Sequence, residues 1–268
     1  MLKINTLFIA QIKYLFIHFL ILFFPNKINV MRSLIYHSIF KKKKIINDIH
    51  SVQYSDFKKQ IKILSNNENY KVTTIQNYMP LEKNLTKIII TFDDGYKDTF
   101  KLAYPILKKN KLPFTVFITT SNIKNKSKIF LNKSEIKQLA KDPLVTIGSH
   151  SVNHLNLNKL SKKKLIFELK ESKKYLEKIT NKKINCISFP NGEFNKRVIS
   201  TCKMTGYKYC FNSIPTFNSF KKNKTYLVNR QAIILFDKKT GFLNKIRGKY
   251  DMISNLKKFK YSNILKKK

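Results

Sequence analysis

The sequence predicts an α/β fold, in which a parallel sheet closes or nearly closes into a barrel of about seven β/α units. Three observations lead to this prediction. Apolar segments of strand length alternate with amphipathic segments of helix length between residues 32 and 235. The central apolar run, 88–92, lacks polar alternation, which is typical of a strand covered on both faces. The connections are short, so right-handed crossovers and parallel neighbours are expected.

The predicted elements follow from spacing and from punctuating residues. Strands are expected at 32–37, 72–75, 88–92, 114–119, 144–148, 185–189, 207–211 and 226–235. Helices are expected at 54–64, 100–107, 135–140, 162–179 and 197–204. Pro105 is expected to kink the second helix, and Ser161 to cap the fourth. Strand and helix alternate along almost the whole chain.

The length allows one large core, so a single catalytic domain is expected at 31–250. Residues 1–30 form a hydrophobic N-terminal segment, and residues 251–268 form a lysine-rich C-terminal tail that is expected to fray. No internal repeat divides the chain further.

The apolar stretch from Leu7 to Phe24 approaches the roughly 20 residues that a membrane span requires, so it is a candidate membrane anchor. No small-residue cleavage site follows it, which disfavours a removable signal peptide. Lysines after the stretch favour a cytoplasmic domain by the positive-inside tendency. Two locations stay open: the bacterial envelope, anchored through residues 7–24, or the cytoplasm, with translation starting at Met31.

The net charge of +39 is carried by lysine, because only four of the 54 basic residues are arginines. Arginine is the usual reader of phosphates and base edges, so specific nucleic-acid binding is not expected. The three cysteines have neither metal-type spacing nor an even number, so they indicate no disulfide framework.

Two carboxylates, Asp93 and Asp94, follow directly on the central strand and precede Gly95. Catalytic residues of barrels lie where such strands end. Neighbouring carboxylates resist joint ionisation unless a cation compensates, so the pair indicates a metal partner. The alternative is an ordinary Asp-Gly turn.

Two imidazoles, His150 and His154, leave a later strand four residues apart. If the segment turns helically, both rings share a face and reach one cation. The alternative is a surface or core pair without a metal. Together with Asp94, however, the pair provides two imidazoles and one carboxylate, the ligand set that leaves a fourth position open on zinc.

The segments 91–95, Thr-Phe-Asp-Asp-Gly, and 150–154, His-Ser-Val-Asn-His, closely resemble the first two signature motifs of polysaccharide deacetylases, the NodB-homology proteins of carbohydrate esterase family 4. The resemblance covers about residues 32–235. It implies a distorted (β/α)7 barrel. It also implies one divalent metal on Asp94, His150 and His154, with zinc favoured over cobalt, nickel or manganese, and a metal-bound water that Asp93 activates as general base.

Residues 188–192, Ser-Phe-Pro-Asn-Gly, resemble a variant of the third motif of the family and depart from it. Ser188 stands where an arginine is usual, and Asn191 where a tyrosine is usual. Arg230 is therefore the candidate tether of Asp93, with a surface role as the alternative. The resemblance implies that Pro190, Asn191 and Gly192 contact the substrate or its oxyanion.

The general acid of the family is usually a late histidine, but this chain has no histidine after His154. Residues 36–39, Tyr-His-Ser-Ile, resemble the opening motif of a subgroup in which the N-terminal strand supplies that histidine. His37 is then the candidate acid, because the first and last strands of a closed barrel are neighbours. The alternative is a strand-end histidine with satisfied hydrogen bonds.

The resemblance implies a hydrolase of carbon–nitrogen bonds other than peptide bonds, which deacetylates an N-acetylated sugar in a polysaccharide or envelope glycan. Two alternatives stay open: a deformylase or deacetylase of a lipid- or nucleotide-linked sugar, and a glycan-binding homologue without activity. The loop at 216–224 is expected to shape the glycan groove.

Overall fold

The structure is a computed structural model of the chain, and it describes residues 2–27, 29–41, 49–78, 84–124, 128–218 and 226–251. The predicted tail beyond residue 251 and residues 219–224 of the predicted groove loop lie outside these ranges.

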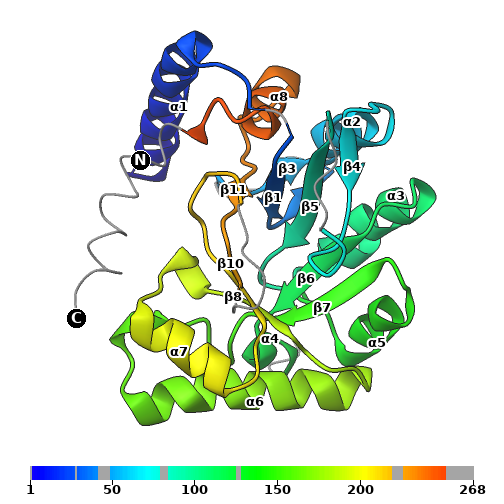
Figure 1. Cartoon of the computed structure of the whole chain (residues 1–268), viewed down its shortest axis with the longest axis vertical. Helices are drawn as coiled ribbons and strands as arrows, with labels where there is room; N and C mark the ends of the chain where they lie inside the picture. The colour runs from blue at the N-terminus through cyan, green and yellow to red at the C-terminus, as the bar shows by residue number, and fades with distance from the viewer. Residues whose placement is uncertain are drawn as a thin grey trace.

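A curled parallel sheet forms the centre of the described molecule (Figure 1), and its strands run in the order β10-β9-β8-β7-β6-β5-β1-β11, with β4 also paired to β5. The strands of the sheet are β1 (Met31–Tyr36), β4 (Tyr70–Val72), β5 (Thr86–Phe92), β6 (Phe114–Ile118), β7 (Val145–Ser149), β8 (Cys186–Ser188), β9 (Tyr209–Phe211), β10 (Tyr226–Val228) and β11 (Gln231–Ala232). A separate short ladder joins β2 (Ile39–Phe40) to β3 (Val52–Gln53).

The predicted strand at 226–235 is wrong in one respect, because the segment forms two strands. Its first half, β10, pairs with β9, and its second half, β11, pairs with β1 at the other end of the sheet. Residues 229–230 carry the chain from one end of the sheet to the other, so this segment bridges the two end strands of a distorted barrel. The break coincides with three polar residues, Asn229, Arg230 and Gln231, which interrupt the apolar run of the predicted strand.

Helices surround the sheet (Figure 1). They are α1 (Leu2–Leu20), α2 (Tyr54–Ser65), α3 (Tyr104–Lys109), α4 (Thr120–Lys124), α5 (Lys133–Lys141), α6 (Lys162–Thr180), α7 (Lys196–Met204) and α8 (Lys239–Ile246). Ser161 caps α6 as predicted, with its side chain accepting from the Lys164 N–H. Pro105 lies in the first turn of α3, after a π-helical turn at Thr99–Ala103, so it starts a helix and does not kink one.

The core explains why the central run lacks polar alternation. Every residue of β5 is buried. Ile88 and Ile90 belong to the cluster under the surrounding helices, whereas Ile89 between them belongs to a second cluster with Phe117 and Phe211. Successive side chains of a strand point to opposite faces, so both faces of β5 are covered.

The N-terminal segment forms α1 and a 3₁₀ turn at Ile21–Phe23. Among the described helices, none combines the length and the apolar character that a membrane crossing needs. One face of α1 contacts α8 through side chains of Tyr14 and His18. Neither α8 nor the start of α1 was predicted as a helix.

Candidate active site

Parallel pairing brings the predicted site residues to one edge of the sheet. Tyr36 pairs with Phe92 in register, so His37 and Asp93 follow their strands side by side. The Asp93 N–H donates to the Tyr36 carbonyl at 2.9 Å. On the other side of β6, Ile118 pairs with Ser149, and His150 comes next. The carboxyl ends of β1, β5 and β7 therefore carry the site, as barrel geometry predicts.

The turn after β5 points both carboxylates into this edge. Asp94 and Gly95 both have positive φ, +69° and +75°. A Cβ at Gly95 would lie 3.3 Å from the Ile118 side chain, so glycine satisfies both the backbone conformation and the close packing. The segment is therefore an Asp-Gly turn, and the same turn presents the two carboxylates. The turn and the pair of acid groups are not alternatives.

Asp94, His150 and His154 form a compact triangle of ligand atoms. The Oδ1 atom of Asp94 lies 3.4 Å from Nε2 of His150 and 3.3 Å from Nε2 of His154. All three groups offer atoms within 4.8 Å of one another. Ligands of a tetrahedral zinc, with bonds of about 2.0–2.2 Å, lie about 3.3–3.6 Å apart. The donor set and its spacing therefore fit one divalent cation.

The ring of His150 is held in the orientation that a metal requires. Its Nδ1 lies 2.8 Å from the Ser188 carbonyl oxygen, which can only accept. Nδ1 therefore carries the proton, and Nε2 presents its lone pair towards Asp94. His150 is 2% exposed, whereas the side chain of His154 is 37% exposed. The triangle is thus open to solvent on the His154 side.

The segment between the histidines is a loop, so the predicted helical turn is wrong. Ser151 and His154 both have positive φ, +64° and +55°. Even so, the two rings meet, with centroids 4.7 Å apart. Two serine side chains support the loop. The Ser151 N–H donates to Ser149 Oγ, and the His154 N–H donates to Ser151 Oγ, both at 3.1 Å.

Glu168, in the middle of α6, fixes the same loop. It is fully buried, and its Oε2 accepts the backbone N–H groups of Val152 and Asn153, both at 2.9 Å. Its Oε1 accepts from the Asn153 side-chain amide at 2.7 Å. A weak signal for this role is present in the sequence, because Glu168 lies on the mainly apolar face of α6 beside Leu165 and Leu169.

We expect Glu168→Gln to weaken zinc binding by about tenfold, because a Gln amide N–H₂ would face N–H donors at one of the two oxygen positions. Calorimetric titration of the metal-free protein with zinc measures the affinity. The control is Glu171→Gln, an exposed position on the same helix. Equal affinities in the two variants would contradict a positioning role for Glu168.

Asp93 is buried and paired with Arg230 in two parallel bonds. Arg230 Nη1 lies 2.7 Å from Oδ1, and Nη2 lies 2.8 Å from Oδ2. Ser188 Oγ donates to Oδ2 at 3.0 Å and accepts from Arg230 Nη2 at 2.6 Å. The tether that the sequence analysis proposed is therefore present. Ser188 occupies the position of the usual arginine, and its small side chain bridges the pair.

Every N–H of the Arg230 guanidinium has a partner. Besides Asp93 and Ser188, it donates to Thr91 Oγ1 at 3.0 Å and, from Nε, to the Asn212 carbonyl at 2.9 Å. Arg230 is 0% exposed, and its guanidinium lies over the Phe117 and Phe211 rings. A surface role for Arg230 is thereby excluded.

These contacts set the charge of Asp93. Burial alone would raise the pKa of Asp93, but the Arg230 guanidinium against it holds that pKa well below its usual range. Asp93 is therefore ionised at neutral pH, and both its oxygens are held in fixed positions.

His37 lies beside the two aspartates. Burial lowers the pKa of His37, and the charges of Asp93 and Asp94 oppose that effect, which places the ring within their electrostatic reach. Its Nδ1 is buried without a hydrogen-bond partner in the described protein. The ring also contacts His50, with centroids 4.9 Å apart. Since Nδ1 is unpaired among the described residues, His37 differs from a strand-end histidine with satisfied hydrogen bonds.

The predicted oxyanion residues form a 3₁₀ turn at Pro190–Gly192, directly after β8. Proline has no N–H, and the Gly192 N–H donates within the turn to the Phe189 carbonyl at 2.8 Å. Asn191, exposed and with φ of +57°, is the remaining backbone candidate of the three.

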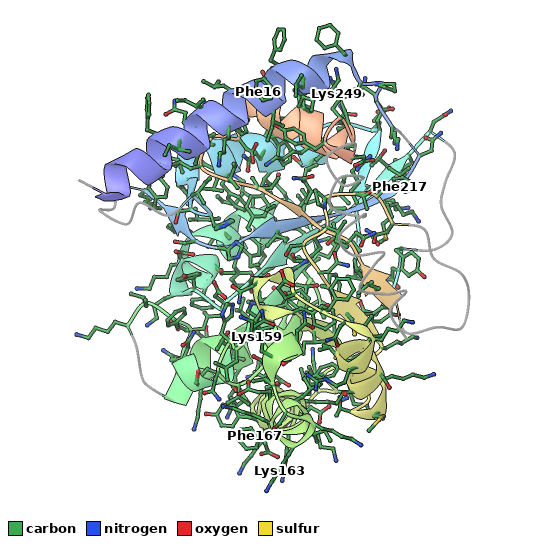
Figure 2. The ribbon with its side chains drawn as sticks, turned by 90° about the vertical axis from the view of Figure 1, so that its left-hand side faces the viewer. Phe16, Lys159, Lys163, Phe167, Phe217 and Lys249 are labelled. Atoms are coloured by element: carbon green, nitrogen blue, oxygen red, sulfur yellow. The ribbon has the colours of Figure 1, made fainter. Side chains whose placement is uncertain are left out.

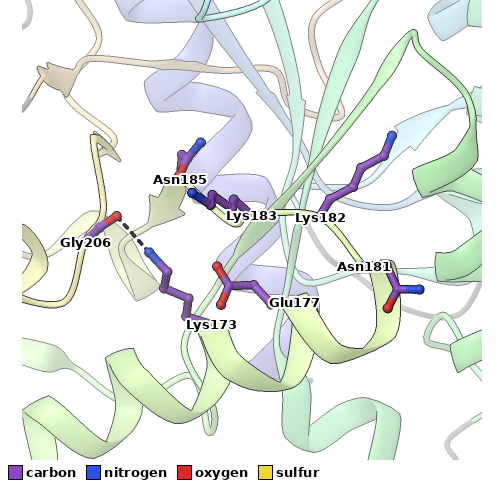
Figure 3. A pocket seen from close by; sticks show the side chains of 7 residues that line it. All are labelled: Lys173, Glu177, Asn181, Lys182, Lys183, Asn185 and Gly206. Carbon is purple, nitrogen blue, oxygen red and sulfur yellow. Dashed lines mark hydrogen bonds between the residues drawn. The ribbon is translucent and has the colours of Figure 1, made fainter.

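A hollow of about 640 Å³ lies elsewhere, between the end of α6 and the segment before β8. Figure 3 shows its lining, which includes Lys173, Lys183 and Glu177, with Lys173 donating to the Gly206 carbonyl. Asn185 precedes β8, so the hollow lies at the amino ends of the strands, away from the candidate site.

Comparison with known proteins agrees with this geometry. The family model of polysaccharide deacetylases matches residues 82–210. The chain is 32% identical over 202 residues to the poly-beta-1,6-N-acetyl-D-glucosamine N-deacetylase of Staphylococcus aureus strain MRSA252, covering 70% of this chain and 68% of that protein. It is 31% identical over 182 residues to YxkH of Bacillus subtilis, of which it spans 61%.

Solved structures show the same fold. The Streptococcus pyogenes deacetylase PplD, in complex with acetate, superposes with a TM-score of 0.72 at 24% identity, covering 81% of this chain and 98% of that one. A polysaccharide deacetylase from Bacillus cereus superposes with a TM-score of 0.71 at 25% identity, covering 81% and 69%. The chain belongs to the polysaccharide deacetylase family, hydrolases of carbon–nitrogen bonds other than peptide bonds, and has the distorted barrel of that family.

Proposed function

We propose that this protein hydrolyses the acetamido group of N-acetylated sugar units in a polysaccharide and releases acetate. The observation that carries the proposal is the triangle of Asp94, His150 and His154 beside the ionised Asp93. The relative from Staphylococcus aureus is named for N-deacetylation of a β-1,6-linked N-acetylglucosamine polymer. We propose a substrate of the same chemical class here.

Asp94, His150 and His154 are the residues that would hold a divalent cation, with zinc as the proposed metal. The chemistry that such a cation supplies is Lewis acidity, which lowers the pKa of a water molecule and polarises the amide carbonyl. Asp93 accepts a proton from the attacking water, and its tether to Arg230 keeps its carboxylate aimed during the step. The backbone N–H of Asn191 is the proposed donor to the developing oxyanion.

His37 completes the proton transfers. Attack of water on the acyl carbon must be followed by cleavage of the carbon–nitrogen bond, and an amine leaves only after its nitrogen has gained a proton. His37 lies on the Asp93 side of the edge, with a buried ring nitrogen that can carry this proton. The products are acetate and the free amino sugar.

The experiment is to load the full chain with zinc and measure acetate release from β-1,6-linked N-acetylglucosamine oligomers. We expect one zinc per chain and acetate release that dipicolinate abolishes and added zinc restores. Bound zinc without acetate release from any N-acetylated or N-formylated sugar would overturn the proposed hydrolysis and favour a glycan-binding role. Failure to bind a divalent metal would overturn the proposed site itself.

A further inference from the structure

The N-terminal helix presents large apolar side chains to solvent. In α1 and the turn after it, eight of them are between 43% and 75% exposed: Phe8, Ile9, Ile12, Leu15, Phe16, Phe19, Leu20 and Phe23. At 3.6 residues per turn they fall within one continuous sector of about 140°. Figure 2 shows Phe16 on the outer side of this helix. We call these eight side chains the apolar stripe.

The opposite face of the helix packs on the protein through apolar and polar side chains together, with Ile21 buried and Tyr14 and His18 hydrogen-bonded. The Tyr14 hydroxyl donates to Asp237 Oδ1 at 3.2 Å, and His18 lies 3.3 Å from the Tyr250 hydroxyl and 3.4 Å from the Asn244 amide. A Cβ at Gly241 would lie 2.1 Å from the Tyr14 hydroxyl, so the absence of a side chain there lets α1 approach α8.

An ordinary surface helix turns polar side chains to solvent, whereas large apolar side chains cover the solvent side of α1. Exposed apolar patches of several hundred Å² mark sites of interaction with proteins, ligands or membranes. Of the large apolar side chains that are exposed in the described part of the chain, only Ile129, Phe167 and Met204 lie outside the stripe, and they are scattered. The stripe is therefore a concentrated surface feature that the proposed hydrolysis does not use.

We propose that the apolar stripe binds the surface of a lipid bilayer with anionic headgroups, with α1 lying in the plane of the interface. Charge supports this partner. The first 47 residues contain no acidic residue, and the whole chain carries +39. Lys13 is exposed at one border of the stripe, and Lys27 is exposed just after it. Apolar residues on one side with lysines at the border are typical of interfacial helices.

A second copy of the chain is a poorer partner for the same surface. Dimerisation through the stripe would bring together two molecules that each carry +39, and like charges repel. An anionic bilayer instead gains from every lysine near its surface. The inference rests on α1 and α8 alone, so it holds whether or not the proposed hydrolysis is correct.

The test is sedimentation of the full chain with vesicles of phosphatidylcholine alone and with vesicles that contain an equal share of phosphatidylglycerol. We expect binding to the anionic vesicles to fall at least tenfold in the triple variant Phe8→Gln, Phe16→Gln, Phe19→Gln. The matched control is Ile129→Gln, Phe167→Gln, Met204→Gln, which removes equally exposed apolar side chains elsewhere. Binding of the control is expected to stay unchanged.

Three results would overturn the proposal. Unchanged vesicle binding in the stripe variant would show that the stripe is not the contact. A dimer that dissociates in the stripe variant, without vesicle binding by the unmodified chain, would assign the surface to a second copy. Resistance to alkaline carbonate extraction would contradict an in-plane helix. Thermal unfolding of the stripe variant near that of the unmodified chain shows that its fold is intact.

Discussion

Asp93→Asn is expected to lower kcat for acetate release by about 10³-fold, within the range typical of losing a general base. The amide keeps the shape of the side chain and one acceptor for Arg230, but it cannot take a proton from water. Zinc binding is expected to stay within a few-fold, because Asp94, His150 and His154 are unchanged. Acetate release and zinc titration on the same preparation measure both quantities.

The control for this prediction is His37→Asn, tested on two substrates. An amide needs a proton on its leaving nitrogen, whereas 4-nitrophenyl acetate has a leaving group that departs as an anion. We expect Asp93→Asn to slow both reactions and His37→Asn to slow only the amide. Normal amide hydrolysis in Asp93→Asn would remove Asp93 as the base, and equal losses on both substrates in His37→Asn would remove His37 as the acid.

Arg230→Met is expected to lower the free energy of unfolding by about 3–5 kcal/mol, because it leaves Asp93 as an uncompensated buried charge. Arg230 is completely buried, and its guanidinium has five donors engaged with four residues. Denaturant unfolding followed by circular dichroism measures the change. Acetate release is expected to be lost as well, because the base then has no fixed orientation.

The double variant Arg230→Met with Asp93→Asn separates charge from packing. Removing both charges is expected to recover part of the lost stability, whereas two independent sites would show additive losses. Arg197→Met gives the comparison for an exposed arginine, which donates to the carbonyls of Asn158 and Leu160. A cost as small for Arg230 as for Arg197 would contradict a structural role for the pair.

Most of the fold could be predicted because strand and helix periods differ strongly in this chain. The run from Ile88 to Phe92 is a strand buried on both faces, as its unbroken apolar pattern predicts. Ser161 caps the start of α6 with its side chain. The start of α1 and the whole of α8 were not predicted as helices. Their contact depends on Tyr14, His18 and the missing side chain of Gly241, which a search for apolar periodicity does not detect.

The candidate site could be predicted as a set of residues but only partly as a geometry. Strand ends and register place His37, Asp93 and His150 together, and these follow from sequence pattern. The conformation of the loop from His150 to His154 could not be predicted, because it depends on hydrogen bonds to Glu168 in the helix α6. Tertiary contacts of this kind leave only a faint local signal, here a glutamate on an apolar helix face.

The closure of the sheet has a consequence for the order of events during synthesis. Arg230 lies 137 positions after Asp93, in the segment whose two strands join opposite ends of the sheet. The residues that support the triangle of Asp94, His150 and His154, the last of them Ser188, all leave the ribosome before residue 230 does. Asp93 acquires its guanidinium partner only when β10 and β11 have docked. If the proposed hydrolysis needs the Asp93–Arg230 pair, activity begins only after these last strands have docked.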